Sequence, residues 1–132
     1  MARLILDTNA LIQLDRLGVG ATGISASDDV AIAAITLAEL RHGVFAADAT
    51  RRPSREKFVE DVELTIDVLP YTRSTAVEHA ALLDHVRRTG TPRGAHDLMI
   101  AAHARQSGRR IVSLDLKARF SDLPGVDTSA GS

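Results

Sequence analysis

The stretch ARLILDTNALIQL, residues 2–14, contains the first strand and the first helix that the sequence predicts. The apolar residues 4–6 indicate a short buried strand, and the apolar segment 9–17 indicates a helix that ends at Gly18. Thr8 is a good N-cap for that helix. Asp7 therefore lies between the first core strand and the first helix. A carboxylate at the end of a buried strand needs a structural or a functional reason.

The same alternation of short apolar runs and helical segments continues along the chain. Strands separated by helices imply βαβ units and a mostly parallel sheet covered on both faces. We therefore expect an α/β fold in a single domain over residues 1–128, followed by a disordered tail at 129–132. The other expected strands are 30–35, 67–71, 110–115 and 125–128. The other expected helices are one over 37–47 with Thr36 as its cap, one that begins at about 54, one that begins at 76 and stops at Gly90, and one over 95–107.

The composition narrows the class of protein. With 132 residues, 45% of them hydrophobic and 25% charged, the chain can bury a core of its own. Aromatic residues make up 3%, which disfavours base stacking on an aromatic platform, and the lack of cysteine excludes disulfides and thiolate metal sites. We find no signal peptide and no apolar stretch of ~18 residues, so we expect a cytoplasmic protein without a membrane span.

The basic residues are unusual in kind and in distribution. The net charge is −1, which does not by itself indicate a nucleic-acid binder, yet 14 of the 16 basic residues are Arg. The planar guanidinium suits phosphate because it donates two parallel hydrogen bonds. A solvated surface is the alternative explanation for any single cluster. The clusters lie in RRPSREK at 51–57, in RRTGTPR at 87–93 and at Arg109–Arg110.

Four acids are candidates for a site, and two of them stand where an α/β sheet binds ligands. Asp7 and Asp115 follow expected strands, and ligands bind beyond the carboxyl ends of parallel strands. Asp97 heads an apolar helix stripe, and Glu39 lies on a helix side that carries small residues such as Gly43. Each acid alone has a simpler explanation, namely a helix cap, a helix-dipole contact, a surface glutamate or a turn.

Taken together, the acids indicate a metal site. Three or four carboxylates at one sheet edge would repel each other unless a cation lay among them. Hard cations such as Mg²⁺ and Mn²⁺ prefer oxygen ligands, whereas zinc is disfavoured because Cys is absent and His does not dominate the set. Such a site points to phosphoryl chemistry, with water activated by one ion or by two ions ~3.5–4 Å apart.

Four segments then resemble one family. These are LILDTNALIQL, ITLAELRHGV, RGAHDLMIAAHARQSG and IVSLDLKARFSDLPGV, which occur in the same order over roughly residues 3–127. Together they look like a PIN-domain protein, in particular the VapC-type ribonuclease toxins of toxin–antitoxin systems. The resemblance implies a three-layer sandwich with a central parallel sheet and a metal-dependent endoribonuclease activity.

The resemblance also implies roles for the four acids. Asp7 and Asp97 would be the principal ligands of Mg²⁺ or Mn²⁺, and Glu39 would bind metal or orient the attacking water. Asp115 would be the fourth acid, although SLDLKARF departs from the family pattern, with Ser113 for Thr and Phe120 further along. Ser113 and either Thr8 or Asn9 are candidates to hydrogen-bond the acids. Arginines near the site, such as Arg41, Arg93 or those of the RRPSR loop, would hold the RNA backbone.

The expected partners come from the same resemblance. They are an RNA substrate, a VapB-type antitoxin that presents an Arg to the acids, and a second copy of the chain in a homodimer. In-line attack by water would leave a 5′-phosphate and a 3′-hydroxyl. The apolar residues of the first helices are candidates for interface or core: Leu11, Ile12, Leu14, Leu17, Leu37, Leu40 and Val44.

Other classes of protein remain as alternatives. A dehalogenase-like phosphatase would need a second Asp where this chain has Asn9. A phosphoacceptor domain could use Lys117 but lacks the acidic pair. A non-catalytic interaction module, in which the acids merely cap helices, would not respond to metal ions or to EDTA.

Overall fold

A computed structural model describes residues 1–18, 23–114 and 118–128. The expected tail and Asp115 lie outside these described residues. None of the helices in the described ranges is long and apolar enough to cross a membrane. The elements are β1 (Arg3–Leu6), α1 (Thr8–Leu17), β2 (Asp29–Ala33), α2 (Ala34–Ala46), α3 (Arg52–Thr65), β3 (Asp67–Leu69), α4 (Arg73–Thr89), α5 (Ala95–Ser107), β4 (Arg110–Val112) and the short 3₁₀ helix η3 (Phe120–Asp122).

The four strands form one parallel sheet in the order β3-β2-β1-β4. β1 lies in the middle, where Ile5 pairs with Ala31 of β2 on one side and with Ile111 of β4 on the other. The strand expected at 125–128 is reduced to a single parallel bridge between Ile111 and Thr128. The carboxyl ends of β1, β2 and β4 therefore meet at one edge of the sheet.

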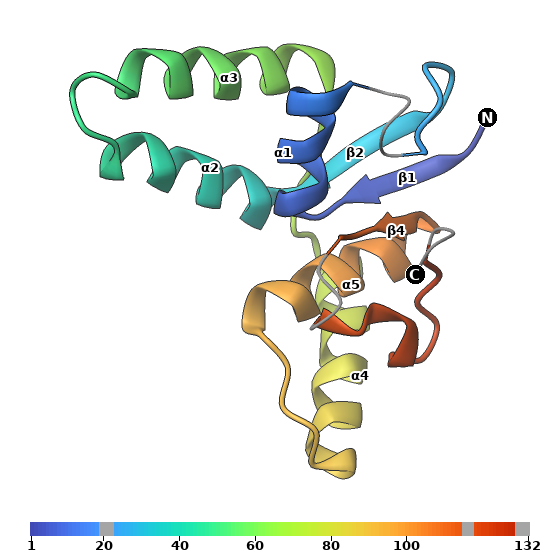
Figure 1. Ribbon diagram of the computed structural model, residues 1–132. Coiled ribbons are helices and arrows are strands. Elements are labelled where there is room, and N and C mark those ends of the chain that lie inside the picture. Colours follow the sequence, from blue (N-terminus) through green and yellow to red (C-terminus); the bar gives the residue numbers. More distant parts are fainter. Residues whose placement is uncertain (19–22, 115–117, 129–132) are drawn as a thin grey trace.

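Helices cover both faces of the sheet, which confirms the expected three layers. Figure 1 shows α1 with the antiparallel pair α2 and α3 on one side, and α4 with α5 on the other. Alternate residues of β1 divide between the two cores: Leu4 and Leu6 pack with α1, α2 and α3, whereas Ile5 packs with α4 and α5. Both faces of β1 are buried, as parallel strands require.

The caps of two helices differ from the expectation, and α4 begins at Arg73 rather than at 76, behind the cap residue Thr72. The cap of α1 is Asp7 rather than Thr8, because Asp7 has the extended backbone of a cap and its side chain accepts from the backbone N–H of Ala10. The predicted cap Thr36 instead lies inside α2, fully buried. β2 runs directly into α2, so Ala33 takes the cap place without a side-chain bond. Side-chain capping is thus used only at the first of these two junctions.

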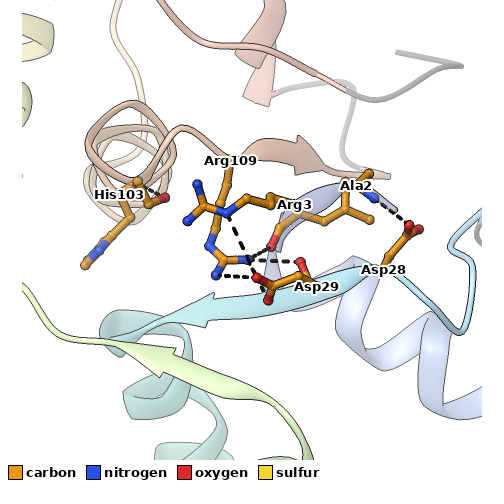
Figure 2. A network of polar contacts seen from close by, with 8 residues as sticks. Ala2, Arg3, Asp28, Asp29, His103 and Arg109 are labelled. Carbon is orange, nitrogen blue, oxygen red and sulfur yellow. Dashed lines mark hydrogen bonds and ion pairs between the residues drawn. The ribbon is translucent and has the colours of Figure 1, made fainter.

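A buried arginine joins three strands at the opposite, amino-terminal edge of the sheet. Arg109 is 6% exposed and donates to the carbonyl oxygens of Leu4 at 3.0 Å and of Asp29 at 2.9 Å. Its Nη1 lies 3.2 Å from Asp29 Oδ1, the ion pair seen in Figure 2. Because β1 lies between β2 and β4, this one side chain fixes the start of all three strands.

Candidate active site

Asp7 is a buried carboxylate at the carboxyl end of β1, with 5% of the residue exposed. Its Oδ1 accepts from the Ala10 N–H at 2.8 Å, and its Oδ2 accepts from the hydroxyl of Ser113, which follows β4. The Asp7 N–H also donates to the Val112 carbonyl at 3.2 Å. Two neighbouring strand ends and the first turn of α1 therefore fix the orientation of this carboxylate.

Glu39 lies one and a half turns into α2 and faces the start of α1. Its Oε1 accepts from the Thr8 hydroxyl at 3.0 Å. Its other oxygen, Oε2, lies 3.5 Å from Nδ1 of His96. Glu39 thus connects the residue after Asp7 with the residue before Asp97.

Asp97 lies in the first turn of α5 and is half-buried. A Cβ atom placed on Gly94, the N-cap residue, would come within 3.1 Å of Asp97 Oδ2, so the carboxylate folds back over the cap. Only glycine leaves this space without a shift of the acid. The N-terminal end of a helix also favours negative charge. The local sequence GAHD therefore holds a carboxylate at the helix start.

The fold brings three of the four predicted acids to the carboxyl edge of the sheet. Contacts running from Thr8 through Glu39 to His96 link the surroundings of Asp7 and Asp97. The fourth predicted acid, Asp115, lies outside the described residues. Within the ranges that the structure describes, no three His, Asp or Glu side chains form a group that could hold a metal ion.

The donor chemistry at this edge fits a hard divalent cation. The three acids offer carboxylate oxygens, and hydroxyl groups orient two of them. Asp7 is buried even though it carries a carboxylate, and burying a charge is costly unless other groups compensate for it. Oxygen donors of this kind are what Mg²⁺ and Mn²⁺ prefer.

Hydrogen bonds to the acids were predicted in part. Those of Ser113 to Asp7 and of Thr8 to Glu39 are confirmed, whereas Asn9 is exposed. His96 was missed, although its place directly before Asp97 in the first turn of α5 is a signal that could have indicated it.

Two arginines expected to hold the RNA backbone are engaged elsewhere. Arg41 pairs with Glu63 of α3. The side chain of Arg93 is 6% exposed and donates to the carbonyl oxygens of Ala118 at 2.6 Å and Arg119 at 2.7 Å. Arg41 is thus held by an exposed ion pair and Arg93 by backbone carbonyls, and their contact with an RNA backbone stays a prediction.

Known proteins share this sequence and this fold. The family model for the PIN domain matches residues 4–125. The tRNA(fMet)-specific endonuclease VapC of Salmonella typhimurium is 34% identical over 96 residues, which cover 72% of this chain and 70% of that protein. Ribonuclease VapC of Rickettsia bellii is 31% identical over 125 residues, which cover 94% of this chain and 92% of that protein.

Solved structures agree with the sequence comparison. The crystal structure of DNA-bound VapBC from Salmonella typhimurium superposes with a TM-score of 0.84 at 28% identity and covers 98% of both chains. VapBC-5 from Mycobacterium tuberculosis gives a TM-score of 0.73 at 31% identity, covering 87% of this chain and 86% of that one. Both the order of the elements and the sequence thus lead to one family. This chain belongs to the PIN domain family and, within it, to the VapC ribonucleases.

Proposed function

We propose that this protein is a metal-dependent endoribonuclease toxin that a VapB-type antitoxin neutralises. The observation that carries the proposal is the chain of contacts at the carboxyl edge of the sheet from Thr8, next to Asp7, through Glu39 to His96, next to Asp97. PIN-domain ribonucleases depend on metal ions as a class. Relatives of this chain are named ribonucleases, and its structural neighbours include toxin–antitoxin complexes.

The metal ion of this proposal is Mg²⁺, with Mn²⁺ as a substitute. Asp7 and Asp97 are its principal ligands, Glu39 joins the acidic cluster, and Asp115 is the fourth acid. When bound, the ion would activate water and neutralise charge that develops on the phosphate. All of these donors are carboxylates, which is the chemistry such an ion prefers.

The surrounding residues prepare the acids for this role. The Ala10 N–H and the Ser113 hydroxyl fix both oxygens of Asp7, so that the carboxylate does not have to reorganise when substrate arrives. Thr8 holds one oxygen of Glu39, and the other, Oε2, which lies 3.5 Å from His96 Nδ1, would orient the attacking water. Attack on an RNA phosphodiester in line with the leaving oxygen gives a 5′-phosphate and a 3′-hydroxyl.

The proposal includes the setting in which the enzyme acts. One PIN domain occupies residues 1–128, and the chain forms a homodimer and a complex with its antitoxin. Its RNA substrate lies in the cytoplasm. Apolar side chains available for interfaces are exposed on α1, α2 and α4, namely Leu17, Phe45, Val77 and Leu83.

RNA cleavage by the purified protein tests the proposal. A labelled transfer-RNA pool is a rational first substrate, because relatives are named for tRNA(fMet). Wild type, Asp7→Asn and Asp97→Asn are compared in Mg²⁺, Mn²⁺ and EDTA. Asp61→Asn is the matched control, since Asp61 is exposed on α3 and pairs with Lys57.

We expect cleavage that needs metal, leaves 5′-phosphate ends, survives in the control and is lost in both site variants. Cleavage that persists in EDTA or in both site variants would contradict the acidic site. A wild type that neither responds to metal ions nor cleaves any RNA would favour a non-catalytic module.

A further inference from the structure

A pocket of about 400 Å³ opens directly beside the acidic site. It lies between α1, α2 and α3, and its wall begins with Thr8 and Glu39, the two residues that the acidic site joins by a hydrogen bond. From there it continues along α3 past Arg55 and Phe58. Its volume is within the range of pockets that bind small molecules. A molecule held in it would therefore lie next to the acids.

Arg55 extends from α3 across this pocket to α2. A Cβ atom placed on Gly43 would lie 3.6 Å from Nη1 of Arg55, so the guanidinium rests on the helix surface where Gly43 has no side chain. Gly43 follows Glu39 by four residues, which places the two on the same face of α2. The guanidinium thus lies one helical turn from the carboxylate of the acidic site.

The cations of this pocket are available to an outside anion. Among the described residues, neither Arg55 nor Arg16, which also lines the pocket, takes part in an ion pair. Arg41 and Arg93, in contrast, are occupied by Glu63 and by backbone carbonyls. Both pocket arginines are exposed, whereas Phe58 is half-buried and supplies aromatic surface beside them.

We propose that this pocket binds one nucleotide of the RNA next to the phosphodiester that is cut. Arg55 donates to the phosphate of that nucleotide, and Phe58 contacts its base. Guanidinium suits phosphate, and a base can stack on an aromatic ring whatever its sequence. The inference rests on the proposed function, because it names how the same site holds its RNA. An RNA fits better than a peptide because the unpaired cations continue directly into the acids where a phosphodiester has to lie.

Steady-state cleavage of a short single-stranded RNA tests this subsite. Arg55→Ala removes the phosphate contact, Phe58→Leu keeps the apolar volume without the ring, and Arg55→Lys keeps the charge. Arg73→Ala is the matched control, because it removes one exposed Arg from the start of α4, which lies on the other side of the sheet. The constants kcat and KM are measured at saturating Mg²⁺ over a range of salt concentrations, after circular dichroism has confirmed that each variant is folded.

We expect Phe58→Leu to raise KM about five-fold or more, because loss of one base–aromatic contact corresponds to at least that factor. Arg55→Ala should raise KM by at least as much, because it removes a hydrogen bond to a charged phosphate. kcat stays within about two-fold, since the subsite binds ground state and transition state alike. The slope of log KM against log salt decreases by about 0.7 in Arg55→Ala, as for one lost phosphate contact on a single strand. Arg55→Lys recovers most of the salt slope, and Arg73→Ala matches wild type.

Binding of the same RNA in EDTA, where metal-dependent cleavage does not proceed, is followed by fluorescence anisotropy and separates this inference from the proposed function. A wild type that binds in an Arg55-dependent manner but never cleaves would support the subsite and overturn the nuclease. A wild type that cleaves while Arg55→Ala and Arg73→Ala share one KM and one salt slope would overturn the subsite. Loss of antitoxin binding in Arg55→Ala with unchanged RNA constants would also overturn it and assign the pocket to the antitoxin.

Discussion

Asp7 has a structural and a chemical role, and two substitutions separate them. Asp7→Ala removes the oxygen that accepts from the Ala10 N–H and the acceptor of the Ser113 hydroxyl. Asp7→Asn keeps one oxygen for Ala10 and places an amide group where it can donate to Ser113. Both substitutions remove the negative charge that the acidic site needs.

The two contacts set the expected difference in stability. Loss of an N-cap side chain costs about 1 kcal/mol in unfolding free energy. A part-buried hydroxyl that loses its acceptor adds about 1 kcal/mol. Asp7→Ala should therefore be about 2 kcal/mol less stable than Asp7→Asn. Relief of repulsion from the other acids is common to both variants and cancels in their difference.

Urea unfolding followed by circular dichroism measures this difference. EDTA is present throughout, because a bound cation would stabilise the wild type by mass action. If the Ala and Asn variants have equal m-values, their unfolding free energies can be compared directly. Both variants should be inactive. Equal stability of the Ala and Asn variants would refute the capping geometry, and cleavage by Asp7→Asn would refute the chemical role.

Three further predictions concern other parts of the fold. Arg109→Met should lower the unfolding free energy by about 2–4 kcal/mol, because it removes the donor of two backbone carbonyls and leaves Asp29 with the longer, 3.9 Å ion pair to Arg3; urea unfolding with Arg110→Met as control checks this. Gly43→Ala should raise the melting temperature, with a gain of about 0.5–1 kcal/mol, because the new methyl meets nothing closer than Arg55 at 3.6 Å; a lower melting temperature would contradict this. Burial, and to a smaller extent the nearby His79, lowers the pKa of His103 from its ordinary 6.5. The unfolded chain therefore binds the proton more readily, so stability should be fully present above pH 6.5 and fall as the pH drops below it, with a weaker decline in His103→Leu.

The local pattern of the sequence was sufficient for the elements and for their class. Short apolar runs that end at polar residues predicted β1 and the later strands, and Gly108 marked the end of α5 at the expected residue. These features depend on residues that are close together in the sequence, so sequence patterns are sufficient to predict them. The parallel α/β class followed from the alternation alone, and with it the expectation that Asp7 lies at a ligand-binding edge.

Helix starts were less predictable, because a capping side chain competes with the path of the backbone. Thr8 and Thr36 have equally suitable hydroxyl groups, yet neither is a cap. In the first case the residue before it, Asp7, already has the extended backbone of a cap. In the second case β2 continues into α2 without an intervening turn, and Thr36 becomes core.

By itself, the sequence determined the α/β class, the family and the presence of acids at strand and helix ends, because each of these features depends on a short motif. The contacts that make a site of them were decided by the tertiary structure alone. Glu39 meets Thr8 across 31 positions and Ser113 meets Asp7 across 106, and which arginines remain unpaired depends on the same packing. Hydrophobic patterning places a side chain inside or outside, but it does not state which strand lies beside which. That order, β3-β2-β1-β4, is a property of the whole packed chain.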